Sequence, residues 1–111
     1  MIVAFSVAPS GDAPAGHLDP EARGDSVHDA VAAAVAVVRA SGLPNSTSSM
    51  FTEIEGEWDE VMAVVKEATE AVGRFGSRVS LVLKADIRPG RTGELTGKVA
   101  RLEAALAEEA R

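Results

Sequence analysis

The stretch from Glu57 to Arg88, EWDEVMAVVKEATEAVGRFGSRVSLVLKADIR, changes its hydrophobic period from that of an α-helix to that of a β-strand. Over Glu57–Arg74, apolar residues recur at helical spacing and form a stripe along one face. Trp58 opens this stripe, so we expect it to pack in the core, with stacking near a pocket mouth as the alternative. Over Arg78–Arg88, apolar and polar residues alternate, which is typical of a strand with one buried face. This stretch therefore predicts one amphipathic helix followed by one strand.

The first half of the chain contains the same two kinds of element. Met1–Pro9 alternates as a strand, and Ser10–Gly24 is rich in glycine and proline, which predicts a loop. Asp25–Ser41 has a helical apolar face and is followed by a glycine and a proline that end the helix. Asn45–Ile54 predicts two short strands joined by a tight turn near Ser49–Met50.

A last helix is predicted after the turn at Pro89-Gly90. Its apolar residues form a narrow seam that consists of Leu95, Val99, Leu102 and Leu106. The seam is too short for an independent coiled coil, so we expect it to pack on its own domain or on a second copy of the chain.

The order of elements is β-α-β-β-α-β with an additional C-terminal helix. This order predicts an α+β, ferredoxin-like sandwich in a single domain over residues 1–111, with both main helices on one face of the sheet. The other face is then left uncovered, although it carries the apolar residues Ile2, Ala4, Phe51 and Val82. An apolar face of this kind is usually covered by a partner or a ligand, so we expect a homo-oligomer.

Composition excludes several classes of function. The chain has 111 residues, 46% of them hydrophobic and 25% charged, as in an ordinary globular domain. With 11 basic and 17 acidic residues its net charge is −6, which argues against nucleic acid or an anionic membrane surface as partner. It has no cysteine for a disulfide, a thiol nucleophile or a thiolate metal site. No basic region precedes the first strand and no apolar run is long enough to span a membrane, so we expect a cytoplasmic protein.

Several polar residues are candidates for chemistry. Alternation assigns a polar set to the uncovered face: Ser6, Glu53, Glu55, Lys84 and Asp86. Its carboxylates could act in acid–base catalysis, could hold a cationic or amino-bearing ligand, or could be a solvated charge set at the rim of a dimer. Arg88, Arg91 and Lys98 could bind an anion or form a solvated turn. Two histidines, His17 and His28, are too few for a metal site, and none is predicted.

Two stretches resemble the thiamine-binding protein family of small ferredoxin-like proteins. The first is Met50-Phe51-Thr52-Glu53-Ile54-Glu55-Gly56-Glu57-Trp58-Asp59-Glu60-Val61, which is similar to the family's Met-Gly-Thr segment, its following acid and its acidic helix. The second is Leu83-Lys84-Ala85-Asp86-Ile87-Arg88, together with the later Lys98-Val99. The sequence departs from the family pattern at Phe51, where glycine is common, and in the longer loop Ser10–Gly24.

The resemblance implies a non-enzymatic protein, a tetramer built from sheet-packed dimers or a simple homodimer, that binds thiamine or its pyrimidine portion and needs no cofactor. A cationic ligand suits an acidic protein, and hydroxyls and carboxylates can pair with an aminopyrimidine. The implied acceptors are Glu55 and Asp86. The implied hydroxyl contacts are Ser6, Thr47, Ser49 and Thr52. Alternation places Thr52 with Ile54 towards the helices, so a bulge would be needed to turn it to the uncovered face.

Two other functions remain open from the sequence. One is a small ferredoxin-like enzyme that uses Glu55 or Asp86 as a base. The other is a structural oligomer whose uncovered sheet face is filled by its twin and that binds no small ligand.

Overall fold

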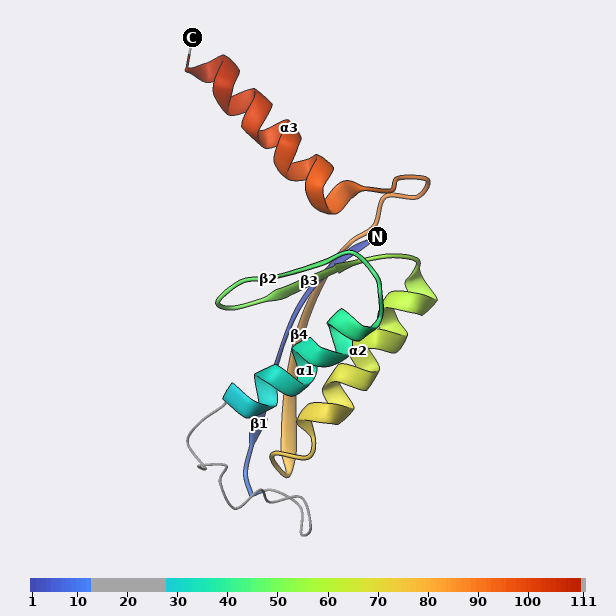
Figure 1. The fold of residues 1–111 in the computed structure, drawn as a ribbon, viewed down its shortest axis with the longest axis vertical. Coiled ribbons are helices and arrows are strands. Elements are labelled where there is room, and N and C mark those ends of the chain that lie inside the picture. Colours follow the sequence, from blue (N-terminus) through green and yellow to red (C-terminus); the bar gives the residue numbers. More distant parts are fainter. Residues whose placement is uncertain (13–27, 111) are drawn as a thin grey trace.

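The computed structural model describes residues 1–12 and 28–110, which form one four-stranded antiparallel sheet and three helices (Figure 1). The elements in chain order are β1 (Ile2–Ser10), α1 (His28–Ala40), β2 (Asn45–Thr47), β3 (Thr52–Glu55), α2 (Trp58–Val72), β4 (Arg78–Asp86) and α3 (Glu94–Glu109). The strands are ordered β2-β3-β1-β4 in the sheet. The ferredoxin-like fold is therefore confirmed. Most of the loop predicted over Ser10–Gly24 lies outside the described residues.

β1 is a central strand that pairs with both β3 and β4. Val3 lies opposite Ile54 on one side and Ala85 on the other, and Phe5 lies opposite Thr52 and Leu83. The pairing of β1 with β3 is one-to-one from Ile2 to Phe5, without an inserted residue. Alternation therefore decides which side chains reach each face of the sheet.

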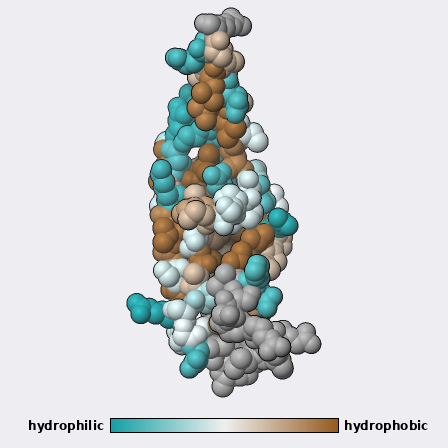
Figure 2. Space-filling model, turned by 90° about the vertical axis from the view of Figure 1, so that its left-hand side faces the viewer, coloured by the Kyte–Doolittle hydropathy of each residue, from teal (hydrophilic) through white to brown (hydrophobic). Residues whose placement is uncertain are grey.

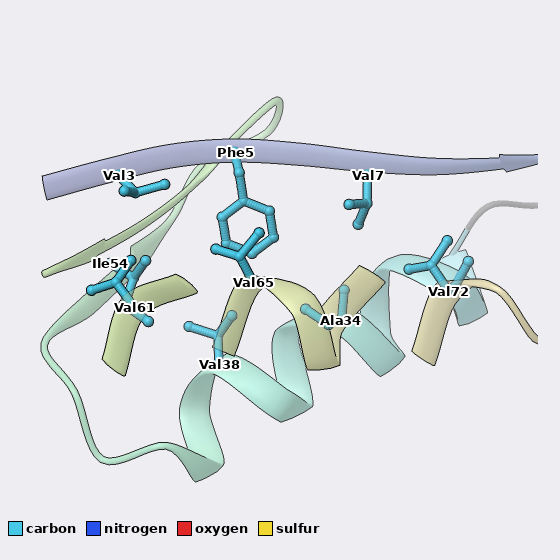
Figure 3. Close-up of a cluster of buried hydrophobic side chains, with 11 residues drawn as sticks. Val3, Phe5, Val7, Ala34, Val38, Ile54, Val61, Val65 and Val72 are labelled. Carbon is cyan, nitrogen blue, oxygen red and sulfur yellow. The ribbon is translucent and has the colours of Figure 1, made fainter. Parts of the chain in front are cut away.

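The core lies between the sheet and the paired helices α1 and α2 (Figure 3). Val3, Phe5 and Val7 point from β1 towards these helices and are at most 8% exposed. They pack in one cluster with buried residues of the other elements, namely Ala30, Ala34, Val38, Ile54, Val61, Val65, Ala68 and Val72. Phe5 is the only aromatic residue among them, so small aliphatic side chains provide most of the packing.

Gly76 permits the close return of the chain from α2 to β4. A Cβ atom at this position would lie 2.5 Å from the carbonyl oxygen of Ser10, closer than real Cβ contacts allow. The end of β1 therefore lies directly against the start of the last strand.

Trp58 corrects one expectation from the helical stripe, which predicted a core residue. Its side chain is 55% exposed. It is the first residue of α2, and helical side chains lean towards the helix N-terminus, so this one extends past the end of the packed face.

α3 projects from the body of the molecule, so the longest dimension of the molecule is 57 Å (Figure 1). Its seam residues Val99, Leu102 and Leu106 are 53–58% exposed, so most of the seam does not pack on its own domain. The helices in the described part of the chain include none long and apolar enough to cross a membrane.

The packing of Phe5 gives a first prediction. Phe5→Ala should lower the free energy of unfolding by about 3–5 kcal/mol, because it removes a fully buried ring and leaves a cavity. Urea unfolding followed by circular dichroism measures this loss. Ile87→Ala, at a side chain that is 54% exposed, is the matched control and should change the value by less than about 0.5 kcal/mol. Equal losses in the two variants would contradict the observed core.

Candidate functional site

A small cavity lies on the helix side of the sheet, between the β2–β3 hairpin, β1 and α1. We call it the hairpin cavity; its volume is about 80 Å³. Its wall consists of Phe5, Ser6 and Val7 from β1, Val31, Ala34 and Val35 from α1, and residues 47–52 from the hairpin. The lining therefore combines an apolar surface from β1 and α1 with hydroxyl groups from the hairpin, the mixture expected of a small-molecule site.

The hydroxyl of Ser48 fixes the turn of this hairpin. Ser48 donates from its backbone N–H to the carbonyl oxygen of Phe51 over 2.9 Å, and Phe51 N–H donates to Ser48 Oγ over 3.2 Å. Ser48 Oγ also donates to the same Phe51 carbonyl. This local ring of hydrogen bonds holds Ser49 and Met50 at the exposed tip and Phe51 at the cavity wall. Phe51 was expected on the uncovered face of the sheet, but it precedes the first residue of β3, so strand alternation does not fix its side, and it borders the cavity on the helix side.

Three of the six residues implied as ligand contacts come together here: Thr47, Ser49 and Thr52. Thr52 pairs with Phe5 and with Thr47 in regular register, and it faces the helices as alternation predicts. No bulge is needed, because the cavity is on that face. Ser6 belongs to the wall between Phe5 and Val7, although strand alternation turns its side chain to the other face.

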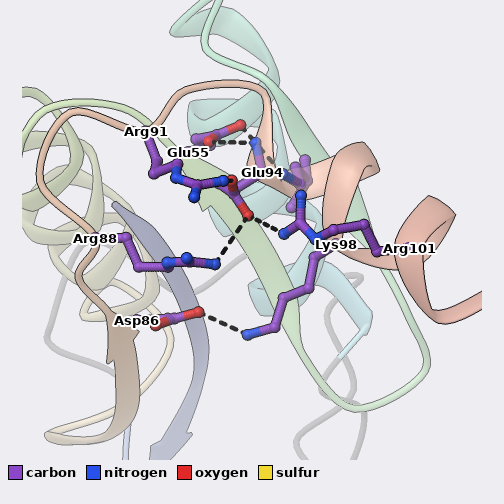
Figure 4. A network of polar contacts seen from close by, with 8 residues as sticks. Glu55, Asp86, Arg88, Arg91, Glu94, Lys98 and Arg101 are labelled. Atoms are coloured by element: carbon purple, nitrogen blue, oxygen red, sulfur yellow. Dashed lines mark hydrogen bonds and ion pairs between the residues drawn. The ribbon is translucent and has the colours of Figure 1, made fainter.

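Asp86 lies on the other face of the sheet, which α1 and α2 leave uncovered and which we call the open face. A groove of about 220 Å³, the α3 groove, runs between the open face and the first turns of α3. It is lined by Ile2, Ala4, Glu53, Lys84, Asp86, Glu94, Leu95, Lys98 and Val99. Asp86 Oδ2 accepts a hydrogen bond from Lys98 Nζ over 2.6 Å (Figure 4). The structure thus separates Asp86 from the hairpin hydroxyls by the thickness of the sheet.

Glu55 is only 6% exposed, because its carboxylate caps the N-terminus of α3. Oε2 accepts the backbone N–H of Glu94 over 2.8 Å, and Oε1 accepts that of Leu95 over 3.2 Å. These are two of the amide groups that a helix leaves unpaired at its start, and the helix dipole favours a negative charge there. Glu55 therefore joins β3 to a helix that begins 39 residues later.

A second carboxylate, Glu94, organises the turn between β4 and α3, and sequence reasoning did not single it out. Its side chain is 9% exposed and lies within 3.9 Å of the guanidinium nitrogens of Arg88, Arg91 and Arg101 (Figure 4). The sequence contained a signal for this cluster, because Arg91 and Arg101 lie three residues before and seven residues after Glu94, a spacing that can bring them to the same side of a helix. The sequence left open whether Arg88 and Arg91 bind an anion, and in the structure both lie beside a carboxylate of the same chain, Glu94.

These ion pairs change the acidity of both carboxyl groups. The hydrogen bond from Lys98, with the positive charge of that residue, lowers the pKa of Asp86. The hydrogen bond from Arg101 lowers the pKa of Glu94 against the opposing effect of its burial, and the charges of the three arginines add to this. Both groups therefore stay ionised into acidic solution. Residues 1–12 and 28–110 contain no group of three or more His, Cys, Asp or Glu side chains arranged to hold a metal ion.

Residues 3–103 match the family described as thiamine-binding protein, and the chain belongs to this family. A UPF0045 protein of Mycobacterium bovis is 50% identical over 104 residues, which cover 93% of this chain and 91% of that protein. A UPF0045 protein of Synechocystis is 37% identical, over 72% of this chain and 67% of the relative.

Solved structures share the fold. A protein of Methanocaldococcus jannascii superposes with a TM-score of 0.74 at 27% identity, covering 92% of this chain and 94% of the other. A Thermotoga maritima protein, whose name provisionally connects it with thiamine biosynthesis or salvage, gives a TM-score of 0.66 at 26% identity. That superposition covers 91% of this chain and 96% of the other.

The cap of α3 gives a second prediction. Glu55→Gln removes the charge and leaves one acceptor oxygen for two amides, so the root of α3 should open more easily. Hydrogen exchange of the first α3 amides should accelerate about tenfold or more, since hydrogen bonds to a charged group contribute about 1.5–3 kcal/mol. Glu53→Gln is the matched control, because Glu53 is an exposed carboxylate on the same strand that does not cap α3. Unchanged exchange in Glu55→Gln would show that the cap does not stabilise this helix.

The two lowered pKa values give a third prediction, on acid. A carboxyl whose pKa is lower in the folded state stabilises that state above its unfolded pKa, and this contribution is lost as pH falls through the folded pKa. We therefore expect the ion pairs of Asp86 and Glu94 at the start of α3 to persist below the pH at which free carboxyl groups titrate and to be lost in more acidic solution. Amide chemical shifts of α3, followed by NMR from pH 6 to pH 2, measure this. Detachment already near pH 5 would contradict the ion pairs.

Proposed function

We propose that the protein binds thiamine or a related aminopyrimidine reversibly in the hairpin cavity and releases it unchanged. The observation that carries this proposal is the gathering of Thr47, Ser49 and Thr52 on the hairpin side of a cavity whose opposite wall, from β1 and α1, is mostly apolar. Membership in the thiamine-binding protein family supports the class of ligand.

The chemistry of the cavity lining suits an aminopyrimidine ring. Such a ring offers an amino N–H donor beside a ring-nitrogen acceptor, and each hydroxyl can both donate and accept. Val31, Val35 and Phe51 supply apolar surface for the faces of the ring. The net charge of −6 favours the approach of a cationic ligand.

The size of the cavity limits what enters it. At about 80 Å³ it is smaller than the roughly 150 Å³ cavity that admits benzene in another protein. We therefore propose that only the pyrimidine ring enters, that the exposed turn at Ser49 and Met50 moves outwards to admit it, and that a thiazolium ring stays outside. Phe51, present where the family commonly has glycine, narrows this entrance.

The groups around the cavity favour binding over catalysis. No histidine or carboxylate belongs to its described lining, so the ligand would meet no general base there. Glu55 and Asp86, the two bases considered for an enzyme, are bound to α3 on the other side of the sheet. The same contacts argue against their earlier assignment as ligand acceptors.

We further propose that the protein acts as a homo-oligomer through its open face. Val82 on this face is 57% exposed and lies opposite Ser6 of the central strand, and Ala4 and Ile2 follow along the same face of that strand. A second copy of the chain would cover these residues and would leave the hairpin cavity accessible on the opposite side of the sheet.

Calorimetric titration with thiamine and with hydroxymethylpyrimidine tests the binding proposal. We expect saturable binding and recovery of unchanged ligand. Thr52→Val should weaken binding about tenfold, because it removes one hydrogen bond of about 1–1.5 kcal/mol while keeping the shape of the side chain. Ser46→Ala, on the neighbouring strand and outside the cavity, is the control and should bind as the unmodified protein does.

Two results would contradict the proposed site. Undiminished binding by Thr52→Val would remove the hairpin hydroxyls from the ligand contacts. Loss of binding in Asp86→Asn, with Thr52→Val unaffected, would move the ligand to the α3 groove. Conversion of the ligand during the titration would show that the protein is an enzyme.

A further inference from the structure

Basic charge is concentrated where β4 ends and α3 begins. Residues 84–101 contain five Lys or Arg residues and only two Asp or Glu residues, although the whole chain has a net charge of −6. Figure 2 shows hydrophilic surface on both sides of the apolar strip along the projecting helix, which is α3 in Figure 1. Both basic residues of this helix, Lys98 and Arg101, belong to its first half, where Glu55 attaches the helix to the sheet.

A tight turn brings two of the arginines together. The backbone N–H of Arg91 donates to the carbonyl oxygen of Arg88 over 3.1 Å, and Gly90 between them has a φ of +78°. Proline at the second position and a left-handed glycine at the third are typical of a type II turn, whose first and last residues are close neighbours. The Pro89-Gly90 pair therefore places Arg88 and Arg91 next to each other.

Glu94 gathers three guanidinium groups around one carboxylate (Figure 4). Arg88 and Arg101 lie at its Oε2 atom, and Arg91 lies at its Oε1 atom. The Glu94 side chain is only 9% exposed, whereas the three arginine side chains are 47–54% exposed. The carboxylate is therefore on the inner side of this arginine cluster, and the guanidinium groups form its outer surface.

Two of the three guanidinium groups keep unused N–H donors. Arg101 donates a hydrogen bond to Glu94, but the nearest nitrogens of Arg88 and Arg91 lie 3.9 and 3.8 Å from its oxygens, which is too far for a hydrogen bond. Among residues 1–12 and 28–110, neither of these two guanidinium groups donates a hydrogen bond. Both are held in place by charge, and both can donate to a further acceptor.

The charges of the arginine cluster do not balance. Three guanidinium groups and one carboxylate leave two positive charges, and the neighbouring pair of Asp86 and Lys98 is neutral by itself. The carboxylate of Glu55 binds backbone amides of α3 instead. Like charges at short distance repel each other, so an anion with a double negative charge would stabilise the cluster. A phosphate monoester has about −1.5 to −2 charges at pH 7, and its oxygens fit the planar donor pattern of arginine.

We propose that Arg88, Arg91 and Arg101 form a binding site for a phosphate group, in which Arg88 and Arg91 donate hydrogen bonds to the phosphate oxygens. Glu94 fixes the spacing of the guanidinium groups, so less side-chain freedom is lost when the anion binds. The ligand is a phosphorylated small molecule or the free phosphate ion. None of these arginines lines the hairpin cavity, so the inference is independent of the proposed binding of thiamine.

Calorimetric titration with inorganic phosphate and with methyl phosphate tests the site. We expect saturable binding at one site per chain, because two neighbouring guanidinium groups can each form charge-assisted hydrogen bonds. Dimethyl phosphate, which carries a single charge, should bind at least tenfold more weakly. Methyl phosphate that binds as tightly as inorganic phosphate, or more tightly, assigns the site to a phosphorylated small molecule. Tighter binding of inorganic phosphate assigns it to the free ion.

A single substitution separates this site from general attraction between charges. Arg91→Gln should lower the affinity for both phosphate probes at least tenfold, because it removes one charge and most of the donors of that side chain. The circular dichroism spectrum should stay unchanged, since the Arg91 side chain is 54% exposed. Arg39→Gln is the matched control, because Arg39 is an exposed arginine in the last turn of α1 and lies outside the arginine cluster. It should bind both probes as the unmodified protein does.

Three results would overturn the proposal. One is the absence of saturable binding of both phosphate probes at millimolar concentration. Another is an equal loss of affinity in Arg91→Gln and Arg39→Gln, which would show that net charge alone attracts the anion. The third is succinate binding as tight as that of methyl phosphate, which would assign the site to carboxylates. Thiamine titration of Arg91→Gln should give an unchanged affinity, so the failure of one proposed site is distinguishable from the failure of the other.

Discussion

The two-residue period of the central strand β1 is the constraint on which the rest of the structure depends. The odd-numbered residues of this strand, Val3, Phe5 and Val7, are buried in the core under α1 and α2. The even-numbered residues between them, Ile2, Ala4 and Ser6, therefore lie on the opposite face. Because β1 pairs on both sides, the neighbouring strands take their register from it. The hairpin cavity and the α3 groove lie on opposite faces for this reason, and each face can serve a different kind of contact.

The attachment of α3 is the second organising feature. Three carboxylates hold the start of this helix. Glu55 accepts hydrogen bonds from two backbone amides, while Asp86 and Glu94 form ion pairs with basic side chains. Exposed ion pairs contribute little to the free energy of folding. A nearly buried carboxylate that accepts two helix amides contributes more, because removing it would leave buried groups without hydrogen-bond partners. We therefore infer that Glu55 fixes the position of the start of α3 and that the surrounding ion pairs add less to its stability.

Much of the fold could be predicted from the sequence, because its elements follow simple periods. The alternation in β4, the helical stripe of α2 and the position of Thr52 on the helix side all follow from local spacing. The exposure of Trp58 did not follow, since a stripe does not show where the packed face ends. The capping role of Glu55 did not follow either, because its partner amides lie 39 and 40 residues away. Alternation assigns side chains to faces, but it gives no information on which face contains a cavity.

Strand β3 consists of four residues, and each of them serves a different part of the molecule. Thr52 borders the hairpin cavity, Glu53 lines the α3 groove, Ile54 is fully buried in the core and Glu55 caps α3. A rigid displacement of this short strand cannot move one of these side chains without the others. A displacement of β3 as a whole would therefore change the wall of the hairpin cavity and the attachment of the projecting helix together.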